Sequence, residues 1–140
     1  MSDGDLHALT SLCRLRRAET DAARRDLGEA LAREIALSTR DQALREELEA
    51  ARQGAGDFDR EAFTVWWARK RADRSEIAEA MRIAASQTAA ARAVLATRRL
   101  AETAAGDALA KEITARDLTV ARRDQAMLED VARALKRAER

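Results

Sequence analysis

The chain has 140 residues, of which 36% are charged and only 3% aromatic, and it contains no proline. This much charge, combined with abundant Ala, Leu, Arg and Glu, is typical of a coiled coil or a long helix and excludes a globular core of ordinary composition. The hydrophobic content of 46%, spread evenly along the chain, argues against disorder.

The charges and apolar residues also bear on the compartment and on partners. The formal net charge of +1 favours no polyanion, and a single cysteine, Cys13, allows no disulfide within the chain. We find neither a signal-peptide pattern nor an apolar run of membrane-spanning length. We therefore expect a soluble, cytoplasmic protein that does not insert into a membrane.

The first predicted helix covers residues 5–52, and Asp5 is suited to cap its first turn. Its apolar residues recur at spacings of three and four, which places them on one face: Leu6, Leu9, Leu12, Cys13, Leu15, Ala23, Leu27, Ala30, Leu31, Leu37, Leu44 and Leu48. Continuing the phase from Leu6 and Leu27 would bring Glu34 and Asp41 into core positions. We therefore expect the heptad register to drift and the helix pair to supercoil only loosely.

A turn is predicted over residues 53–58, where Gly54 and Gly56 interrupt the helical pattern. Asp57 and Asp59 can accept hydrogen bonds from the first N–H groups of a following helix. A connection this short predicts that the two helices lie antiparallel, as a hairpin.

The second predicted helix covers residues 59–138. It opens with all four aromatic residues and continues with two apolar stretches: Phe58, Phe63, Trp66 and Trp67, then Ile77, Met81, Ala84, Thr88, Ala91 and Leu95, then Leu109, Ile113, Val120, Met127, Val131 and Leu135. Folding back at the turn would pair residue i with about 110 minus i, so the first helix would end opposite Gly106.

Residues 107–140 would then overhang, with an apolar stripe and no partner. They could fold back as a third helix at Gly106, or the helix could run straight through. One glycine costs a helix only about 1 kcal/mol, so we expect the straight helix. The predicted fold is all-α: an elongated antiparallel two-helix coiled-coil hairpin with an overhanging C-terminal helix.

Catalytic chemistry is not expected. His7, the only histidine, and Cys13 lie on different sides of one helix, so they form no nucleophilic pair and no structural zinc site. No glycine-rich phosphate-binding loop is present. We expect a non-enzymatic protein without cofactor or metal.

Two groups of residues are candidate contact sites. Phe63, Trp66 and Trp67, followed by Arg71, either fill the turn end of the hairpin or face outward as an anchor for another protein. Basic residues gather towards the open end: Arg16 and Arg17 on the first helix, and Arg133, Lys136 and Arg137 on the second. Such residues suit a helix C-terminus, and they could also contact an acidic partner surface. Nucleic acid is not an expected partner, because no basic region leads into a zipper.

The chain resembles the flagellar type III export protein FliJ and the injectisome proteins of the YscO type. The resemblance rests on the length, the glycine-containing turn about a third of the way along, the aromatic cluster Phe63 to Trp67, the Glu129-Asp130 pair before a basic C-terminus, and the opening Leu6-x-x-Leu9-x-x-Leu12-x-x-Leu15-Arg16-x-x-Glu19-x-Asp21-x-Ala23-x-x-x-Leu27.

This resemblance implies a stalk whose open end and C-terminal helix insert into the hexameric export ATPase, with the turn region facing the membrane export-gate protein and export chaperones. It implies ATPase contacts by Arg16, Arg17, Arg133, Lys136 and Arg137, and gate or chaperone contacts by Phe63, Trp66, Trp67 and Arg71. The alternative is a generic coiled-coil scaffold or adaptor that homodimerises through residues 107–140.

Overall fold

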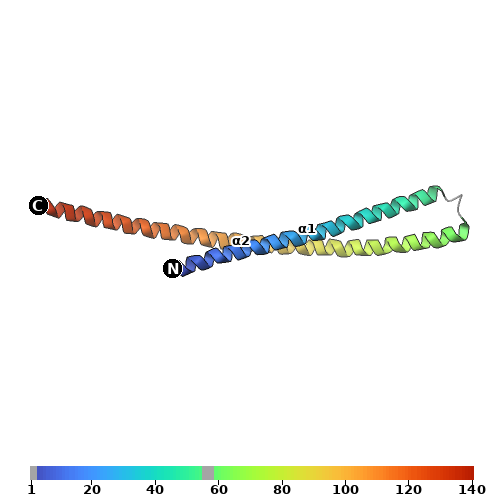
Figure 1. Cartoon of the computed structure of the whole chain (residues 1–140), viewed down its shortest axis with the longest axis horizontal. Helices are drawn as coiled ribbons and strands as arrows, with labels where there is room; N and C mark the ends of the chain where they lie inside the picture. Colours follow the sequence, from blue (N-terminus) through green and yellow to red (C-terminus); the bar gives the residue numbers. More distant parts are fainter. Residues whose placement is uncertain (1–2, 55–58) are drawn as a thin grey trace. The chain divides into compact units, whose positions relative to one another are not determined.

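The computed structural model describes residues 3–54 and 59–140, and it contains two helices (Figure 1). Helix α1 spans Asp3–Gln53 and helix α2 spans Arg60–Ala138. The described residues contain no strand, and the two helices pack against each other, so the predicted all-α helical hairpin is confirmed.

Local hydrogen bonds account for the helix ends that flank the turn. The N–H of Gly54 donates to the carbonyl of Ala50 at 3.1 Å, which closes the last turn of α1. The Oδ1 atom of Asp59 accepts the N–H of Glu61 at 3.3 Å, so Asp59 caps α2 as the sequence predicted. Residues 55–58 lie outside the described residues, and with them Gly56, the expected cap Asp57 and the aromatic Phe58.

The chain divides into two compact units. The hairpin unit comprises Asp21–Thr97, and the terminal unit comprises Met1–Thr20 together with Arg98–Arg140. In the hairpin unit, Leu44, Leu48 and Ile77 form a buried cluster against which Trp66, Trp67 and Met81 pack. In Figure 1 this unit shows the later part of α1 alongside the first half of α2.

Ion pairs fix the antiparallel register within each unit. In the hairpin unit Lys70 Nζ lies 3.1 Å from Glu47 Oε1, and Arg74 Nε lies 3.9 Å from Asp41 Oδ1. In the terminal unit the corresponding pairs are Glu19 with Arg98, Arg17 with Glu102, and Asp3 with Arg116. The numbers of these partners add to between 115 and 119. The predicted sum of 110 is therefore wrong, because it centred the reversal of the chain near residue 55, whereas the observed pairs centre it near residue 58.

The expected heptad drift is also wrong. Buried or half-buried positions in α1 alternate at spacings of three and four without interruption: Leu6, Leu9, Cys13, Arg16, Thr20, Ala23, Leu27, Ala30, Glu34, Leu37, Asp41, Leu44, Leu48 and Ala51. The seam, as we call this row, keeps a seven-residue repeat by accepting polar side chains. Asp41 is only 7% exposed, and it is held by Arg45 Nε at 2.9 Å.

The apolar positions predicted in the middle of α2 are confirmed. Ile77, Ala84, Thr88 and Leu95 are all buried. Thr88 differs from the others, since its hydroxyl is enclosed and finds no hydrogen-bond partner. The small side chains of Ala84 and Thr88 allow the two helix backbones to approach closely.

The expected straight C-terminal helix is confirmed, because α2 continues through Gly106 without a break. The overhang is shorter than predicted, since α1 reaches as far as the Asp3–Arg116 ion pair at 2.5 Å. From residue 117 onwards every residue of the terminal unit is exposed. The unpaired stretch therefore begins about ten residues later than Gly106.

Candidate protein-interaction surfaces

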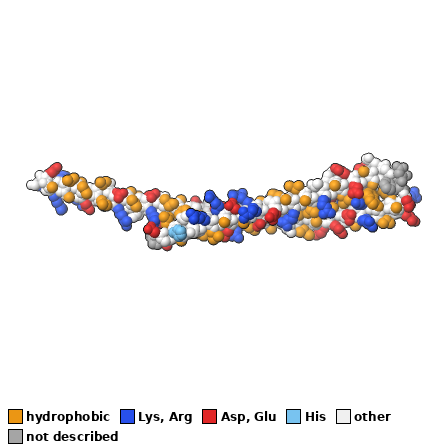
Figure 2. All heavy atoms as spheres, viewed as in Figure 1, with side chains coloured by type: hydrophobic (Ala, Val, Ile, Leu, Met, Phe, Trp, Pro, Cys, Tyr) orange, Lys and Arg blue, Asp and Glu red, His pale blue; other side chains and the backbone are white. Residues whose placement is uncertain are grey.

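An apolar stripe runs along the unpaired end of α2. We call this stripe the C-terminal face and define it by its large apolar residues: Ile113, Val120, Met127, Val131 and Leu135. These side chains are between 44% and 66% exposed. Figure 2 shows hydrophobic side chains at the surface along this end of α2. Contiguous exposed apolar side chains of this kind typically mark a surface that another molecule covers.

The C-terminal face lies to one side of the seam, and at its start Ile113 and Val120 line a groove together with Asp3 and Leu6 of α1. Glu112 and Arg116 are half-buried in the seam, whereas Ile113, one residue on and so about 100° round the helix, is 44% exposed. Continuing the seam beyond Arg116 gives mostly polar positions: Thr119, Arg123, Ala126, Asp130, Arg133 and Arg137. The C-terminal face therefore lies beside the seam, about 100° round α2 from it.

The predicted basic residues fall into two separate groups within the terminal unit. Arg17 lies 3.9 Å from Glu102, and Arg133 lies 3.8 Å from Asp130. Because Glu102 and Arg133 are 31 positions apart on one helix, the groups are about 46 Å apart along its axis. Lys136 and Arg137 are exposed in the last turn of α2. A single small partner surface cannot contact both groups.

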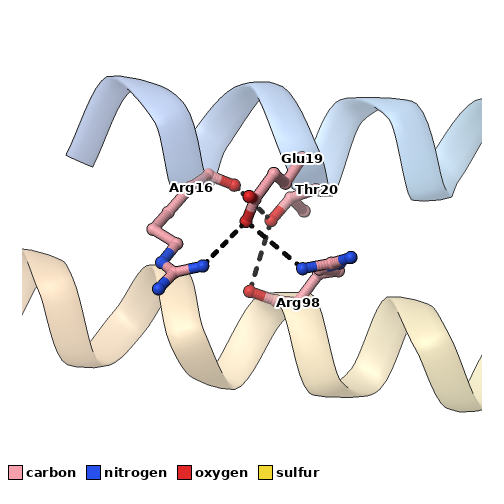
Figure 3. Close-up of polar contacts among 4 residues, drawn as sticks. All are labelled: Arg16, Glu19, Thr20 and Arg98. Carbon is pink, nitrogen blue, oxygen red and sulfur yellow. Dashed lines mark hydrogen bonds and ion pairs between the residues drawn. The ribbon is translucent and has the colours of Figure 1, made fainter. Parts of the chain in front are cut away.

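Arg16 belongs to a polar layer inside the seam (Figure 3). The Oε2 atom of Glu19 accepts from Arg16 Nη1 at 3.0 Å and from Arg98 Nη1 at 3.4 Å. Thr20, which is fully buried, donates its hydroxyl to the carbonyl of Arg16 at 3.0 Å and approaches that of Arg98 at 3.4 Å. Sequence analysis did not identify this layer, although its seven-residue spacing from Cys13 and Leu27 would have revealed Thr20.

The aromatic residues form one cluster at the start of α2. The ring centroids of Phe63 and Trp67 are 5.6 Å apart and stacked, and those of Phe63 and Trp66 are 6.0 Å apart. Lys70 Nζ lies 5.8 Å from the centre of the Trp66 ring while it pairs with Glu47. All three rings are half-buried.

The aromatic cluster is packed against the core on one side and accessible on the other. Trp66 and Trp67 pack on the buried cluster of the hairpin unit, and part of each ring remains accessible. Arg71 is exposed, as is Val65 at 62%. Protein-binding hot spots are enriched in tryptophan and arginine, and here accessible tryptophan rings lie next to an exposed arginine.

Across residues 3–54 and 59–140 no group of three or more His, Cys, Asp or Glu side chains is placed to hold a metal ion. His7 is exposed and Cys13 is half-buried in the seam. The helices within these ranges are not apolar enough over a sufficient length to cross a membrane.

The fold and its exposed faces define a helical-hairpin protein with surfaces suited to contact with other proteins. No protein-family model, curated protein or solved structure matches the chain.

Proposed function

We propose that this chain is a non-enzymatic central-stalk and chaperone-escort component of a type III protein export apparatus of the flagellar kind. The observation that carries the proposal is the C-terminal face, an apolar stripe on an unbroken helix that continues past the last ion pair with α1. Exposing a stripe of this kind to water is unfavourable in free energy, and a partner that covers it removes this cost. The resemblance to the FliJ and YscO-type proteins supplies the identity of that partner.

The C-terminal end of α2 is the part proposed to bind the hexameric export ATPase. An amphipathic helix laid into an apolar groove is a common mode of protein recognition. Arg133, Lys136 and Arg137 would contact acidic residues around that groove, and Arg16 and Arg17 would contact a second part of the ring. Of these five, Arg16 has the least freedom, because Glu19 already holds its guanidinium.

The aromatic cluster is the part proposed to bind the export gate or export chaperones. Phe63, Trp66 and Trp67 present partly accessible rings, and Arg71 lies one turn on with an exposed side chain. Such a stalk would work in the cytoplasm, peripheral to the membrane-bound apparatus, and would need no cofactor, nucleic acid or membrane insertion.

Co-purification with the export ATPase of the same organism tests the proposal. We expect the full chain to elute with the ATPase hexamer in size-exclusion chromatography. We expect the triple variant Arg133→Glu, Lys136→Glu and Arg137→Glu to elute separately while its helical circular dichroism is unchanged.

A matched control makes the same change in net charge at three other positions of α2. The variant Arg82→Glu, Arg92→Glu and Arg99→Glu alters exposed positions far from the C-terminus and should retain the ATPase. If the wild-type chain and the ATPase elute separately at micromolar concentration, the stalk function is wrong.

The alternative is a coiled-coil scaffold that buries the same face by homodimerisation. What favours it is that a second copy would also remove the exposed stripe from water. Sedimentation equilibrium distinguishes the two functions, because the scaffold predicts a dimer of the isolated chain and the stalk predicts a monomer.

A further inference from the structure

Two aspartates lie within the C-terminal face. Asp117 and Asp124 alternate with Ile113, Val120 and Met127 at spacings of four and three, so all five occupy one side of α2. Both aspartates are exposed, and neither forms an ion pair with a described residue. A partner that covers the apolar residues must therefore also cover two carboxylates seven residues apart.

The hairpin unit also contains a carboxylate at a helix–helix contact, and there the carboxylate is paired with cations. Asp41 occupies a seam position of α1 and is 7% exposed, yet it remains compatible with helix packing because arginines reach it. Arg45 from its own helix lies at 2.9 Å, and Arg74 from the opposite helix lies at 3.9 Å. A carboxylate is buried without prohibitive cost only when such a cation accompanies it.

No cation on α2 meets Asp117 or Asp124 in this way. The basic residues that precede each of them, Arg116 and Arg123, project about 100° away from them, and Arg116 is already paired with Asp3. The missing cations must come from whatever molecule covers the face.

We propose that the C-terminal face binds an α-helix of another protein whose contact side alternates apolar residues with Arg or Lys at seven-residue spacing. The apolar residues of that helix pack on Ile113, Val120 and Met127, and its two cations pair with Asp117 and Asp124. The inference deepens the proposed function and rests on it in one respect, namely that this end of α2 has a protein partner.

A second copy of the chain fits this face poorly. If two C-terminal faces paired in parallel, each aspartate would meet its own counterpart, and the like charges would repel. If they paired antiparallel, each aspartate would meet an apolar residue such as Val120 or Met127, which leaves a desolvated carboxylate without a cation. Within the face itself, neither arrangement places a basic residue opposite an aspartate.

Two synthetic peptides test the inference on the full chain. Both are amphipathic helices of about three heptads, long enough to form a helix on binding. The first carries Leu at the positions that face the apolar residues and Arg at the two positions that face the aspartates. The second carries Glu in place of both arginines. Fluorescence anisotropy of the labelled peptides measures their affinities.

We expect wild-type protein to bind the Arg peptide at least about tenfold more tightly than the Glu peptide, as close charge pairs at interfaces do. The double variant Asp117→Lys and Asp124→Lys should reverse this preference. The control variant Asp107→Lys and Glu129→Lys makes the same change in net charge on the other side of α2, and it should retain the wild-type preference.

Several results would overturn the inference. They are equal affinity for the two peptides, binding of neither, an unchanged preference in the aspartate variant, or a dimer of the isolated chain that Val120→Asp dissociates. The proposed function fails separately. If the ATPase captures the aspartate variant as well as it captures wild-type protein, the inference is wrong and the stalk stands. If the peptides discriminate but the ATPase does not bind wild-type protein, the stalk function is wrong and the inference stands.

Discussion

The part of α2 that faces α1 and the part that extends beyond it use similar residues differently. In the paired part a half-buried carboxylate, Glu102, lies among apolar positions, and in the unpaired part Asp117 and Asp124 alternate with Ile113, Val120 and Met127. In the paired part Glu102 pairs with Arg17 from α1, while in the unpaired part Asp117 and Asp124 form no ion pair with a described residue. The comparison teaches that a charged residue in such a seam marks where a partner cation belongs, whether or not the partner is present.

The largest expected effect separates the two parts by stability. Leu44→Ala removes a side chain that is 7% exposed and packs with Leu48 and Ile77, so we expect a loss of about 2–4 kcal/mol in the free energy of unfolding. Met127→Ala, at a position that is 66% exposed, should change it by less than about 0.5 kcal/mol. Urea denaturation followed by circular dichroism measures both. A comparable loss in the two variants would mean that the C-terminal face is already covered in the isolated protein.

A second prediction concerns the aromatic cluster, whose rings are partly buried, like the paired part of α2, and partly accessible, like its unpaired part. Trp67→Ala should lower the free energy of unfolding by about 2 kcal/mol, less than for a fully buried tryptophan, because the ring is only half-buried on the Leu44 cluster. Val65→Ala, at a position that is 62% exposed, is the matched control and should have little effect. If Trp67→Ala were as mild as the control, the cluster would serve binding alone.

The polar layer of the terminal unit gives a smaller effect. Thr20→Val keeps the shape of a fully buried side chain but removes the hydroxyl that donates to Arg16 and approaches the carbonyl of Arg98. We expect a loss of about 1 kcal/mol in the free energy of unfolding, the usual value of one such hydrogen bond. Thermal unfolding measured by circular dichroism would detect it, and a stabilised variant would show that the layer costs more than it contributes.

The same substitution in the hairpin unit should act in the opposite direction. The Thr88 hydroxyl is enclosed and lacks a partner, so Thr88→Val should leave the stability unchanged or raise it by up to about 1 kcal/mol. Calorimetry on both threonine variants provides the comparison. A loss as large as that of Thr20→Val would indicate that a water molecule or another group satisfies the hydroxyl in solution.

The sequence predicted the elements of the fold well, because helix signals are local. The end of α1 before Gly54, the cap at Asp59 and the spacing from Ile77 to Leu95 each depend on neighbours within a few residues, and each is confirmed. The left-handed backbone expected of a glycine at such a helix end is not found at Gly54. The unbroken passage through Gly106 was also predictable from the helix formers around it.

The register and the polar seam were not predictable by the same reasoning. Treating Glu34 and Asp41 as interruptions ignored the ability of an arginine stem to lie across an apolar seam while its guanidinium reaches a carboxylate. Arg74 does this for Asp41. Because the register depends on contacts between residues far apart in the sequence, the length of the overhang and the half-burial of the tryptophans could not be read from spacing either.

The pairing of Asp3 with Arg116 has a consequence for how the chain folds. These residues are 113 positions apart, whereas Glu47 and Lys70 are separated only by the two helix ends and the turn. Each doubling of the enclosed chain adds about 0.6 kcal/mol to the entropic cost of closing a loop. Contacts beside the turn should therefore form first and hold longest, and the Asp3–Arg116 ion pair should close last and fray first.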